Sequence, residues 1–429
     1  MRINMKEFTG KCSCGREHKL AVEEIYLEAG VLEKIPDILS RDRYSGYQSF
    51  VMICDENTYE AAGKKVEQKI EGLRCVKLSS RQLHANEIGV AKVKEALDDV
   101  GDVDCLIAVG SGTIHDLTRY YAYERGIPFI SIPTAASVDG YVSTVAAMSW
   151  YGFKKSMIAV SPMLVIADSS VIANAPMRLT ASGVGDLLGK YTALADWKIT
   201  NILNGEYICD KICRMEYQAL DNLKKSLEGL ASGKTEAYEE LMYGLLLSGL
   251  AMQMTGHSRP ASGAEHHMAH FWEMAVINEE LDAYHGEKVG IGLILASSIY
   301  HEAAEYLRSG DFEIKDHVDI ETDLIEKTFL NKELCENIKK TNTPNLLDTI
   351  AAEKLREQTE EIIRLIEEIP TADTIREMLD IVHGVTSLED IGLDAEMKEK
   401  SARVAPYIRD RLTFLRILKY YNFYDRVIK

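Results

Sequence analysis

Hydrophobic residues follow two different patterns along this chain. Between residues 50 and 168, short apolar runs without polar alternation recur, and charged, helix-like stretches such as EIGVAKVKEALDDVG lie between them. The runs are FVMIC (50–54), CVKLSS (75–80), CLIAVG (105–110), PFISIP (128–133) and LVIAD (164–168). Apolar strands that alternate with helices are typical of a parallel sheet covered on both faces. The first part of the chain is therefore predicted to be an α/β domain with a parallel, Rossmann-like sheet.

From about Thr180 the hydrophobic period becomes that of helices. EAYEELMYGLLLSGLAMQM and LREQTEEIIRLIEEI carry apolar residues at helical spacing, and strand-like runs are almost lacking. The segment NAPMRLTASGVGD, residues 174–186, marks the switch, since its proline and glycines are typical of a turn-rich junction. The pattern predicts two domains, an α/β domain over residues 1–178 and an all-helical domain over residues 179–429.

Composition narrows the classes of partner. The chain has 46% hydrophobic and 27% charged residues and a formal net charge of −18, which fits a soluble globular protein and argues against binding nucleic acid or an anionic membrane, because both need clustered Lys and Arg. The start, MRINMKEFTGKCSCGREHKL, lacks the apolar core of a signal peptide, and no run of about 18 apolar residues occurs. We expect a cytoplasmic protein without membrane insertion.

The cysteines show one cluster. Most of the eight lie in apolar contexts, where a cysteine acts as a small hydrophobic residue. Cys12, Cys14 and His18, in CSCGREH, could form a small metal knuckle, but the sequence has no second ligand cluster of the zinc-ribbon type. A plain N-terminal lead-in is the alternative interpretation.

The segment IAVGSGTIHDLTRY, residues 107–120, joins a buried strand to a helix that begins near Ile114. Backbone N–H groups of such a turn and the positive end of the helix face the same space, which favours phosphate. His115 stands where the dinucleotide fingerprint has its third glycine, so the fingerprint is incomplete. A tight strand-to-helix connection without a ligand is equally consistent with the turn.

Two further strand ends carry polar residues. FVMICDENTY ends at Asp55, placed as the ribose-binding acid of nucleotide folds is, although it precedes the glycine turn, which excludes an ordinary Rossmann order; a helix cap is the alternative. ISIPTAASVDGYVS ends in the small polar residues Thr134, Ser137 and Ser143 around Asp139, which permit a ligand to approach closely. Turn chemistry alone would also explain such a loop.

Four of the eleven histidines lie in residues 263–290. His266 and His270 are four apart in a predicted helix and share a face, His267 points about 100° away, and His285 follows. With Asp186 from GVGDLLGK, two imidazoles would leave positions open on a divalent metal, as a catalytic site requires. Spacing alone favours His266 with His270 but does not show which of the four candidates bind, and a helical histidine is often only a hydrogen-bonded polar group.

These motifs together resemble a known family. VGSGTIHD, ISIPTAASVDG, GVGDLLGKYTALADW, HSRPASGAEHHMAH and HGEKVG occur in order over roughly residues 48–295. In them the chain resembles the bacterial sn-glycerol-1-phosphate dehydrogenases of the AraM type, within the iron-containing alcohol dehydrogenase and dehydroquinate synthase-like superfamily. The resemblance implies the dehydroquinate synthase-like fold, with dinucleotide binding in the first domain and metal and substrate binding in the second.

The implied activity is a reversible NAD(P)H-linked reduction of dihydroxyacetone phosphate, a small phosphorylated triose, to sn-glycerol 1-phosphate. The resemblance implies one divalent metal, zinc foremost with nickel or iron as alternatives, held by Asp186, His266 and His285, and a homodimer. Asp139, His270 and Asp186 would face the substrate, with His270 and Asp186 as the catalytic residues; His270 thus becomes a substrate contact rather than a ligand. The dinucleotide would contact Asp55, Gly110, Ser111, Gly112, Thr113, Ile114, Thr134, Ala135, Ala136, Ser137 and Ser143.

The substrate phosphate needs cations in a chain of net negative charge. Arg259 in HSRPASG and Lys154 and Lys155 in YGFKKSM are the candidates, with surface charge or helix capping as the alternative for each. The chain departs from the family pattern where VGSG replaces a triple glycine and where Arg119 stands in place of a common lysine. These departures concern contacts to the pyrophosphate.

Three other functions are compatible with the sequence. A glycerol or other polyol dehydrogenase would share both sites but would not select a phosphate. A dehydroquinate synthase-like lyase would hold NAD tightly and show no net turnover of it. A noncatalytic scaffold would show no metal-dependent activity, although every motif position carries a chemically competent residue.

Overall fold

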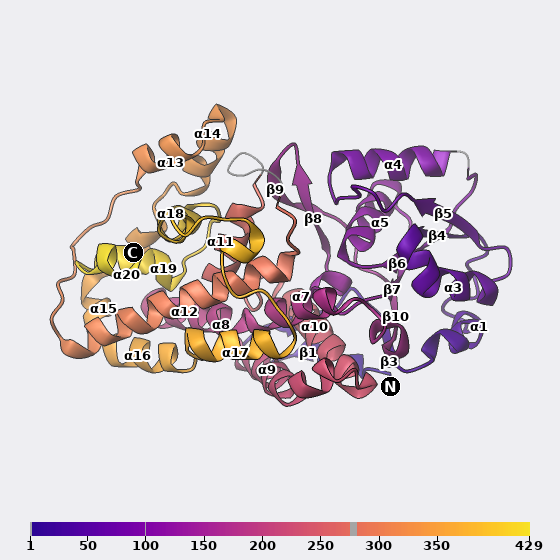
Figure 1. Cartoon of the computed structure of the whole chain (residues 1–429), viewed down its shortest axis with the longest axis horizontal. Helices are drawn as coiled ribbons and strands as arrows, with labels where there is room; N and C mark the ends of the chain where they lie inside the picture. The colour runs from indigo at the N-terminus through magenta and orange to yellow at the C-terminus, as the bar shows by residue number, and fades with distance from the viewer. Residues whose placement is uncertain (1, 99, 275–280) are drawn as a thin grey trace. The chain divides into compact units, whose positions relative to one another are not determined.

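The computed structural model describes residues 2–98, 100–274 and 281–429 (Figure 1). Contacts between Cα atoms divide the chain into two compact units. Unit 1 comprises Met1–Gly183 and Gln218–His257, and unit 2 comprises Val184–Tyr217 and Ser258–Lys429. Each unit is a group of residues in mutual contact and has not been shown to fold by itself. The division into domains between residues 178 and 179 therefore stays a prediction.

Unit 1 is built on a six-stranded sheet in which every pairing is parallel. The strand order is β3-β10-β7-β6-β4-β5. The five predicted runs form five of these strands, and the edge strand β3 was not predicted. The bounds are β3 Glu24–Glu28, β4 Phe50–Asp55, β5 Arg74–Leu78, β6 Cys105–Gly110, β7 Phe129–Pro133 and β10 Leu164–Asp168.

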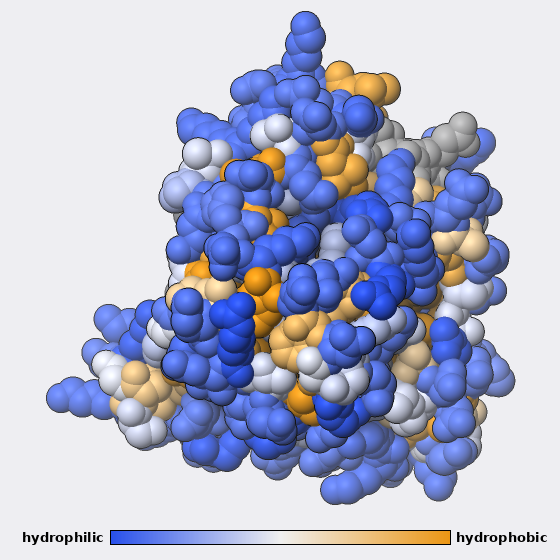
Figure 2. Space-filling view, turned by 90° about the vertical axis from the view of Figure 1, so that its left-hand side faces the viewer, coloured by the Kyte–Doolittle hydropathy of each residue, from blue (hydrophilic) through white to orange (hydrophobic). Residues whose placement is uncertain are grey.

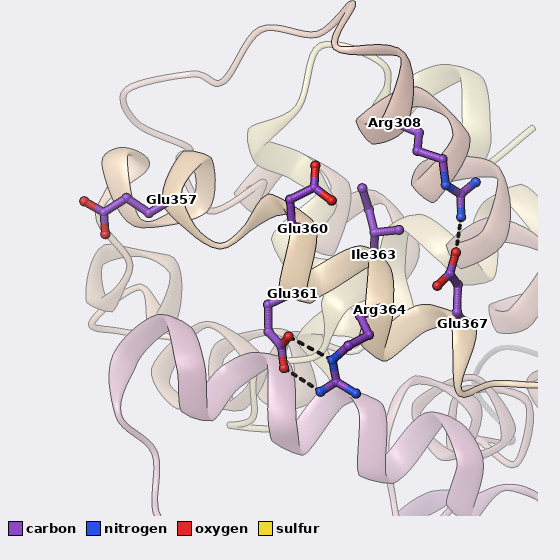
Figure 3. A pocket seen from close by; sticks show the side chains of 7 residues that line it. All are labelled: Arg308, Glu357, Glu360, Glu361, Ile363, Arg364 and Glu367. Carbon is purple, nitrogen blue, oxygen red and sulfur yellow. Dashed lines mark hydrogen bonds and ion pairs between the residues drawn. The ribbon is translucent and has the colours of Figure 1, made fainter.

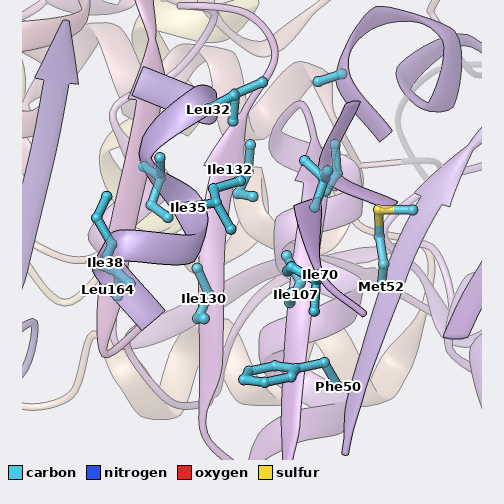
Figure 4. Packing of buried hydrophobic residues seen from close by; sticks show 14 of the residues in the cluster. Leu32, Ile35, Ile38, Phe50, Met52, Ile70, Ile107, Ile130, Ile132 and Leu164 are labelled. Atoms are coloured by element: carbon cyan, nitrogen blue, oxygen red, sulfur yellow. The ribbon is translucent and has the colours of Figure 1, made fainter. Parts of the chain in front are cut away.

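Both faces of the sheet are buried, which explains why its strands lack polar alternation. Along β4, Met52 belongs to one hydrophobic cluster and Ile53 to another. The first cluster includes residues of α1 (Ile35–Leu39) and α3 (Lys64–Lys69), and Figure 4 shows its packing against the strands. The second includes residues of α4 (Glu87–Asp98) and α5 (Gly112–Arg125). The sheet is therefore the middle layer of an α/β arrangement.

Two antiparallel hairpins complete the strands of the described residues. β1 (Gly10–Lys11) pairs with β2 (Glu17–His18) near the N-terminus. β8 (Val145–Trp150) pairs with β9 (Phe153–Ile158). Helices α2 (Glu56–Thr58) and α6 (Ser169–Ile172) each follow a strand of the sheet directly.

The described residues after β10 form helices and connecting segments but no strand, as the sequence predicts. The helices are α7 (Met177–Leu188), α8 (Lys190–Asn204), α9 (Asp210–Ala231), α10 (Thr235–Thr255), α11 (Ala264–Trp272), α12 (His285–Ser309), α13 (Thr322–Thr328), α14 (Lys332–Thr341), α15 (Ala352–Glu357), α16 (Thr359–Glu367), α17 (Ala372–Ile381), α18 (Met397–Val404), α19 (Phe414–Ile417) and α20 (Tyr424–Val427).

One glycine-based expectation is wrong. The predicted turn-rich junction ends at Pro176, because α7 already begins at Met177 and contains Gly183 and Gly185. Gly286 is helical as well, since α12 begins at His285. These glycines allow close contact between backbones, and the helices continue through them. A carbon atom added at Gly183 would lie only 1.9 Å from the carbonyl oxygen of Ala136.

The charged helices between about residues 310 and 400 are solvated. Arg364 and Arg376 are more than two-fifths exposed and pair with glutamate and aspartate on their own helices, and such surface pairs contribute little stability. The face in Figure 2 is mostly hydrophilic, with hydrophobic residues in small separate groups. None of the described helices combines the length and the apolar composition needed to cross a membrane.

Candidate metal centre and nucleotide site

Three predicted metal ligands meet in unit 2. Asp186 lies on α7, His266 on α11, and His285 is the first residue of α12. One ligand atom from each lies within 4.8 Å of the others. Residues 275–280, between the two histidines, lie outside the described part of the chain. Three side chains distant in the sequence thus bring their ligand atoms within reach of one ion.

Glycines bring the three helices close enough for this meeting. A carbon atom added at Gly185 of α7 would lie 2.3 Å from the carbonyl oxygen of Gly286 in α12. One added at Gly292 of α12 would lie 2.5 Å from the carbonyl oxygen of Glu265 in α11. Only residues without a side chain permit such approach. Each of these glycines is next to, or packs beside, a predicted ligand.

Carboxylates orient both imidazoles. His266 Nδ1 lies 2.7 Å from Glu265 Oε1, and His285 Nδ1 lies 2.8 Å from Glu273 Oε1. A carboxylate only accepts hydrogen bonds, so each Nδ1 carries a proton, and in the neutral ring the lone pair is on Nε2, where a metal could bind. This carboxylate–imidazole pairing is the usual support for a histidine that binds a metal.

The start of α11 is fixed by two further hydrogen bonds. The N–H of Gly263 donates to Glu265 Oε1 at 2.7 Å, and the N–H of Ala264 donates to Asp196 Oδ2 at 2.8 Å. The first N–H groups of a helix have no partner within it, so buried carboxylates there satisfy them. Glu265 therefore both caps the helix and orients the His266 ring that the helix carries.

The charges around Asp186 favour a cation. Burial by itself raises the pKa of Asp186, but the Lys190 ammonium, 2.9 Å from Oδ1, and the hydrogen bond from His266 outweigh it and hold the pKa below its ordinary range. Burial by itself lowers the pKa of His266, but Asp186 and Glu265 raise it to about 9. The surroundings that hold a proton on His266 would equally favour a divalent cation.

This donor set fits a catalytic metal ion. One carboxylate and two imidazoles are ligands typical of zinc, and of nickel or iron as well. Three protein ligands leave at least one position of a tetrahedral ion for a substrate. Asp186, His266 and His285 are therefore the residues that could hold a metal.

His270 groups differently from the other histidines. Its ring stacks on His285 with centroids 5.6 Å apart, and it belongs to a second candidate ligand group, with Glu273 and His285. Arg409 donates to His270 Nδ1 at 3.3 Å, so the proton of the neutral ring is on Nε2. The pairing of His266 with His270 that spacing favours is not the group that contains Asp186.

The predicted nucleotide segments lie together in unit 1. Asp55 ends β4, Gly110 ends β6, and Thr134 follows β7. These strands are neighbours and parallel, so their carboxyl ends meet at one edge of the sheet, where ligands of such folds bind. The N–H of Thr134 donates to the carbonyl of Gly110 at 3.0 Å. The structure thus brings three separate sequence segments to one place.

The residues of the turn after β6 occupy a helix start. Ser111 is the N-cap of α5, and Gly112, Thr113 and Ile114 form its first turn. Their N–H groups have no partner within the helix. A carbon atom added at Gly112 would lie 3.2 Å from the Val138 side chain, which leaves little room for any larger residue.

The other nucleotide candidates also form protein contacts. Asp55 Oδ1 accepts a hydrogen bond from the N–H of Thr58 at 2.8 Å. Asp55 therefore caps helix α2, as the alternative interpretation predicts. Ser143 Oγ donates to the carbonyl of Val145 at 2.8 Å. Ser137 is buried, with its Oγ 3.1 Å from the Tyr141 hydroxyl, and Ala135 and Ala136 beside it are buried as well.

His115 is buried beneath the glycine turn. Its Nδ1 lies 2.9 Å from the carbonyl of Ser111 and its Nε2 2.8 Å from Ser131 Oγ. A carbonyl only accepts, so Nδ1 carries the proton and Nε2 accepts from the serine. Burial, and less strongly Arg119, lower the pKa of His115 to about 3 from the ordinary 6.5.

We expect His115 to make unit 1 sensitive to acid. The unfolded chain binds a proton below pH 6.5 and the folded chain does not, so stability is lost as the pH falls from 6.5 toward 3. Between about pH 7.5 and 5.5 this linkage lowers the free energy of unfolding by about 1.4 kcal/mol. Denaturant unfolding at both pH values measures the free energy of unfolding. In His115→Gln, the decrease between the two pH values should be smaller by about 1.4 kcal/mol. Equal losses in both proteins would contradict the prediction.

The predicted phosphate contacts belong to different units. Arg259 is buried and donates to the carbonyl of Leu412 at 2.6 Å, to Thr200 Oγ1 at 2.7 Å and to Glu206 Oε2 at 2.8 Å. These contacts commit its guanidinium to the protein, which disfavours its predicted role at the substrate. Lys154 and Lys155 lie in the β8–β9 hairpin of unit 1, as surface charges.

Asp139 lies in unit 1 beside α10. Its Oδ2 accepts from Ser248 Oγ at 2.9 Å. A carbon atom added at Gly249 would lie 2.8 Å from its carbonyl oxygen. α10 therefore fixes the loop that carries Asp139, and its predicted contact with the substrate stays a proposal.

A pocket elsewhere on unit 2 is lined mostly by charged side chains (Figure 3). Arg308 pairs with Glu367, and Arg364 pairs with Glu361. The arginines are thus already paired with acids of α16. The lining residues are Arg308, Glu357, Glu360, Glu361, Ile363, Arg364 and Glu367, and the histidine cluster is not among them.

Comparison with known proteins decides the family. Residues 26–176, from β3 to the turn before α7, match the family model of iron-containing alcohol dehydrogenases. Glycerol-1-phosphate dehydrogenase (NAD(P)+) of Bacillus licheniformis is 33% identical across 97% of this chain and 94% of that protein. The chain belongs to the glycerol-1-phosphate dehydrogenase family. The resemblance in the sequence motifs is thereby confirmed.

Members of the glycerol-1-phosphate dehydrogenase family also occur in archaea. The enzyme of that name from Pyrococcus furiosus is 35% identical across 65% of this chain and 78% of that protein. Among solved structures, glycerol dehydrogenase from Schizosaccharomyces pombe has a TM-score of 0.60 at 17% identity, with 94% of this chain and 87% of that chain covered. This likeness concerns the fold, and it confirms the predicted fold class.

Proposed function

We propose that this chain catalyses the reversible NAD(P)H-linked reduction of dihydroxyacetone phosphate to sn-glycerol 1-phosphate with one divalent metal ion. The observation that carries the proposal is the meeting of Asp186, His266 and His285 within 4.8 Å of one another. It occurs in a chain whose relatives over almost its whole length are named glycerol-1-phosphate dehydrogenase. A cluster of ligands alone would fit many metalloenzymes, so the proposal needs both.

The chemistry requires polarisation of a ketone and delivery of a hydride. A divalent ion bound by the three ligands would supply the first, and NAD(P)H the second. Asp186 and Lys190 set the charge at the site, and His270 offers an Nε2–H because Arg409 occupies its Nδ1. We assign His270 to the substrate oxygen, where it donates a hydrogen bond and relays a proton.

We assign the remaining contacts by their chemistry. Asp139 faces the substrate, and Asp55 meets the adenosine ribose. The pyrophosphate meets the N–H groups at the start of α5, from Gly112 to Ile114, since a helix start favours anions. Thr134 to Ser137 and Ser143 line the rest of the dinucleotide. Zinc is the proposed metal, and a homodimer and a cytoplasmic location are expected.

Arg409 is our candidate for the substrate phosphate. It is half-buried and lies beside His270, which we place at the substrate. Arg259 is committed to other groups, and Arg411 donates to the carbonyl of Ser262 and to Ser258 Oγ, both at 3.0 Å. A guanidinium matches a phosphate through parallel hydrogen bonds. Arg409 therefore replaces Arg259 in the proposal.

The proposal is tested by NADH oxidation with dihydroxyacetone phosphate. The enzyme is stripped with a chelator and reloaded separately with zinc, nickel or iron, and the product's chirality is determined. We expect metal-dependent turnover that yields sn-glycerol 1-phosphate. A higher kcat/KM for unphosphorylated dihydroxyacetone would indicate a polyol dehydrogenase instead, and turnover without net change in NADH would indicate a lyase.

Arg409→Met tests the selection of the phosphate. We expect kcat/KM for dihydroxyacetone phosphate to fall about 10- to 100-fold, since hydrogen bonds to charged groups contribute about 1.5–3 kcal/mol. Activity with unphosphorylated dihydroxyacetone should fall less, because that substrate loses only the effect of the Arg409 hydrogen bond on His270. Inhibition by inorganic phosphate should weaken in proportion to the loss with dihydroxyacetone phosphate. Arg376→Met, on the exposed side of α17, is the control. Equal losses with both substrates would mean that Arg409 supports the structure of the site and does not select the phosphate.

A further inference from the structure

The N-terminal hairpin of unit 1 carries a second group of metal-binding side chains. β1 and β2 are joined by the turn CSCGR, in which the N–H of Cys12 donates to the carbonyl of Arg16 at 2.9 Å. The N–H of Gly15 donates back to the carbonyl of Cys12 at 3.1 Å, and Gly15 has a φ of +85°. This tight turn directs both cysteines toward the strand that carries His18.

Donor atoms of Cys12, Cys14 and His18 lie within 4.8 Å of one another. Cys14 Sγ is 3.4 Å from His18 Nε2. Sulfur and nitrogen atoms bound to one tetrahedral zinc ion, at about 2.3 Å and 2.0 Å, lie about 3.5 Å apart. The observed separation therefore matches two ligands of one ion.

A hydrogen bond from the end of α10 presets the histidine. His18 is buried, and its Nδ1 lies 2.8 Å from the carbonyl oxygen of Met254. The carbonyl only accepts, so Nδ1 carries the proton and the lone pair is on Nε2, the atom beside Cys14. The backbone thus orients this imidazole as a ligand, as carboxylates do in the histidine cluster.

We propose that Cys12, Cys14 and His18 bind a structural zinc ion, separate from the centre formed by Asp186, His266 and His285. Two thiolates and one imidazole are soft and borderline donors that favour zinc over magnesium or calcium. Nothing in the proposed reaction requires this ion. The proposal therefore stands on the hairpin geometry alone.

The zinc would hold the N-terminal segment on α10. Gln253, next to Met254, accepts from the N–H of Ala21 at 2.6 Å and donates to Ser161 Oγ at 3.0 Å. A two-stranded hairpin this short is marginally stable by itself. A metal ion that joins its turn to its second strand supplies the missing stability, because binding free energy adds to folding.

The test uses the full-length chain with zinc and with cobalt as the probes. Metal content is measured after gel filtration for the wild type and for a Cys12→Ser/Cys14→Ser double variant. We expect the double variant to retain one ion fewer per chain, with unchanged kcat. Cys75→Ser, on strand β5, is the matched control and should retain the wild-type metal content.

Cobalt distinguishes the two centres in the wild-type protein. Only the hairpin site offers thiolates, so its cobalt form should show thiolate-to-metal charge-transfer absorption that is lost in the double variant and kept in Asp186→Asn. Absence of this absorption in the cobalt-loaded wild type would overturn the proposal, even if the double variant fails to fold. So would equal metal content in both proteins. Failure of the dehydrogenase assay would leave either result intact.

Discussion

Asp186→Asn is expected to lose the catalytic metal and nearly all turnover. The amide keeps the shape of the side chain but removes the charge that faces His266 and Lys190. Metal content should fall by one ion per chain, and kcat by about 1000-fold or more, since polarisation of the carbonyl contributes several kcal/mol and each about 1.4 kcal/mol is a tenfold change. Metal analysis after gel filtration and steady-state kinetics measure both.

The variant also tests the charge balance at the site. Lys190 is fully buried, and the variant removes the carboxylate charge of the Asp186–Lys190 ion pair; breaking a buried pair of this kind costs about 3–5 kcal/mol of stability. Circular dichroism and thermal unfolding must therefore accompany the metal analysis. His270→Asn is the matched variant, because it changes the same cluster but should keep the metal and lose rate. A full complement of metal in folded Asp186→Asn would contradict the ligand assignment.

The parallel sheet could be predicted because its strands are buried on both faces. Apolar runs such as CLIAVG, set between helix-like segments, are typical of strands in such a sheet. Several strands escaped prediction, the short hairpin β1–β2 among them. β3, with the sequence EIYLE, has charged ends, and β8–β9 is a partly exposed hairpin with lysines in its second strand. Neither has the continuous apolar pattern that marked the central strands.

The role of the helix glycines could not be derived from pattern. Glycine is common in turns, but the structure places three glycines within helices where backbones approach each other: Gly183, Gly185 and Gly286. Which role a glycine has depends on residues far away in the sequence. One local signal of a charged site within the helices is GVGDLLGK, in which Asp186 on α7 and Lys190 on α8 are four residues apart and form a buried ion pair.

The histidine cluster was recognisable, but its grouping was not. Spacing paired His266 with His270, while the structure places His266 with His285 and Asp186, as the family motifs imply. Arg409 was missed because it lies 139 residues after His270 and its surroundings, YIRDR, read as solvated charge. A contact between two distant segments leaves no trace in the local period of either.

Gly185→Ala should separate two of the metal ligands without touching either. The added carbon would lie 2.3 Å from the carbonyl oxygen of Gly286 and 3.5 Å from the Cα of Gly290. These atoms belong to the backbone of α12, which cannot rotate away as a side chain would. Asp186 and His285 are the direct neighbours of the two residues that collide. We expect α7 and α12 to separate by roughly 1 Å, whereas metal ligands tolerate about 0.2 Å.

The two effects of this substitution oppose each other, and their magnitudes decide the outcome. Alanine in place of glycine gains about 1 kcal/mol of helix propensity, but a displacement of about 1 Å at a catalytic centre costs about 100-fold in rate. We therefore expect weaker metal retention and a kcat at least about 100-fold lower, measured by metal titration and kinetics. Gly290→Ala on the same helix is the control. Its new carbon would meet the side chain of Leu379 at 3.3 Å, which can move, and the Cα of Gly185 at 3.5 Å, an ordinary contact distance. Wild-type metal affinity in Gly185→Ala would mean that the close contact of α7 with α12 does not position the ligands.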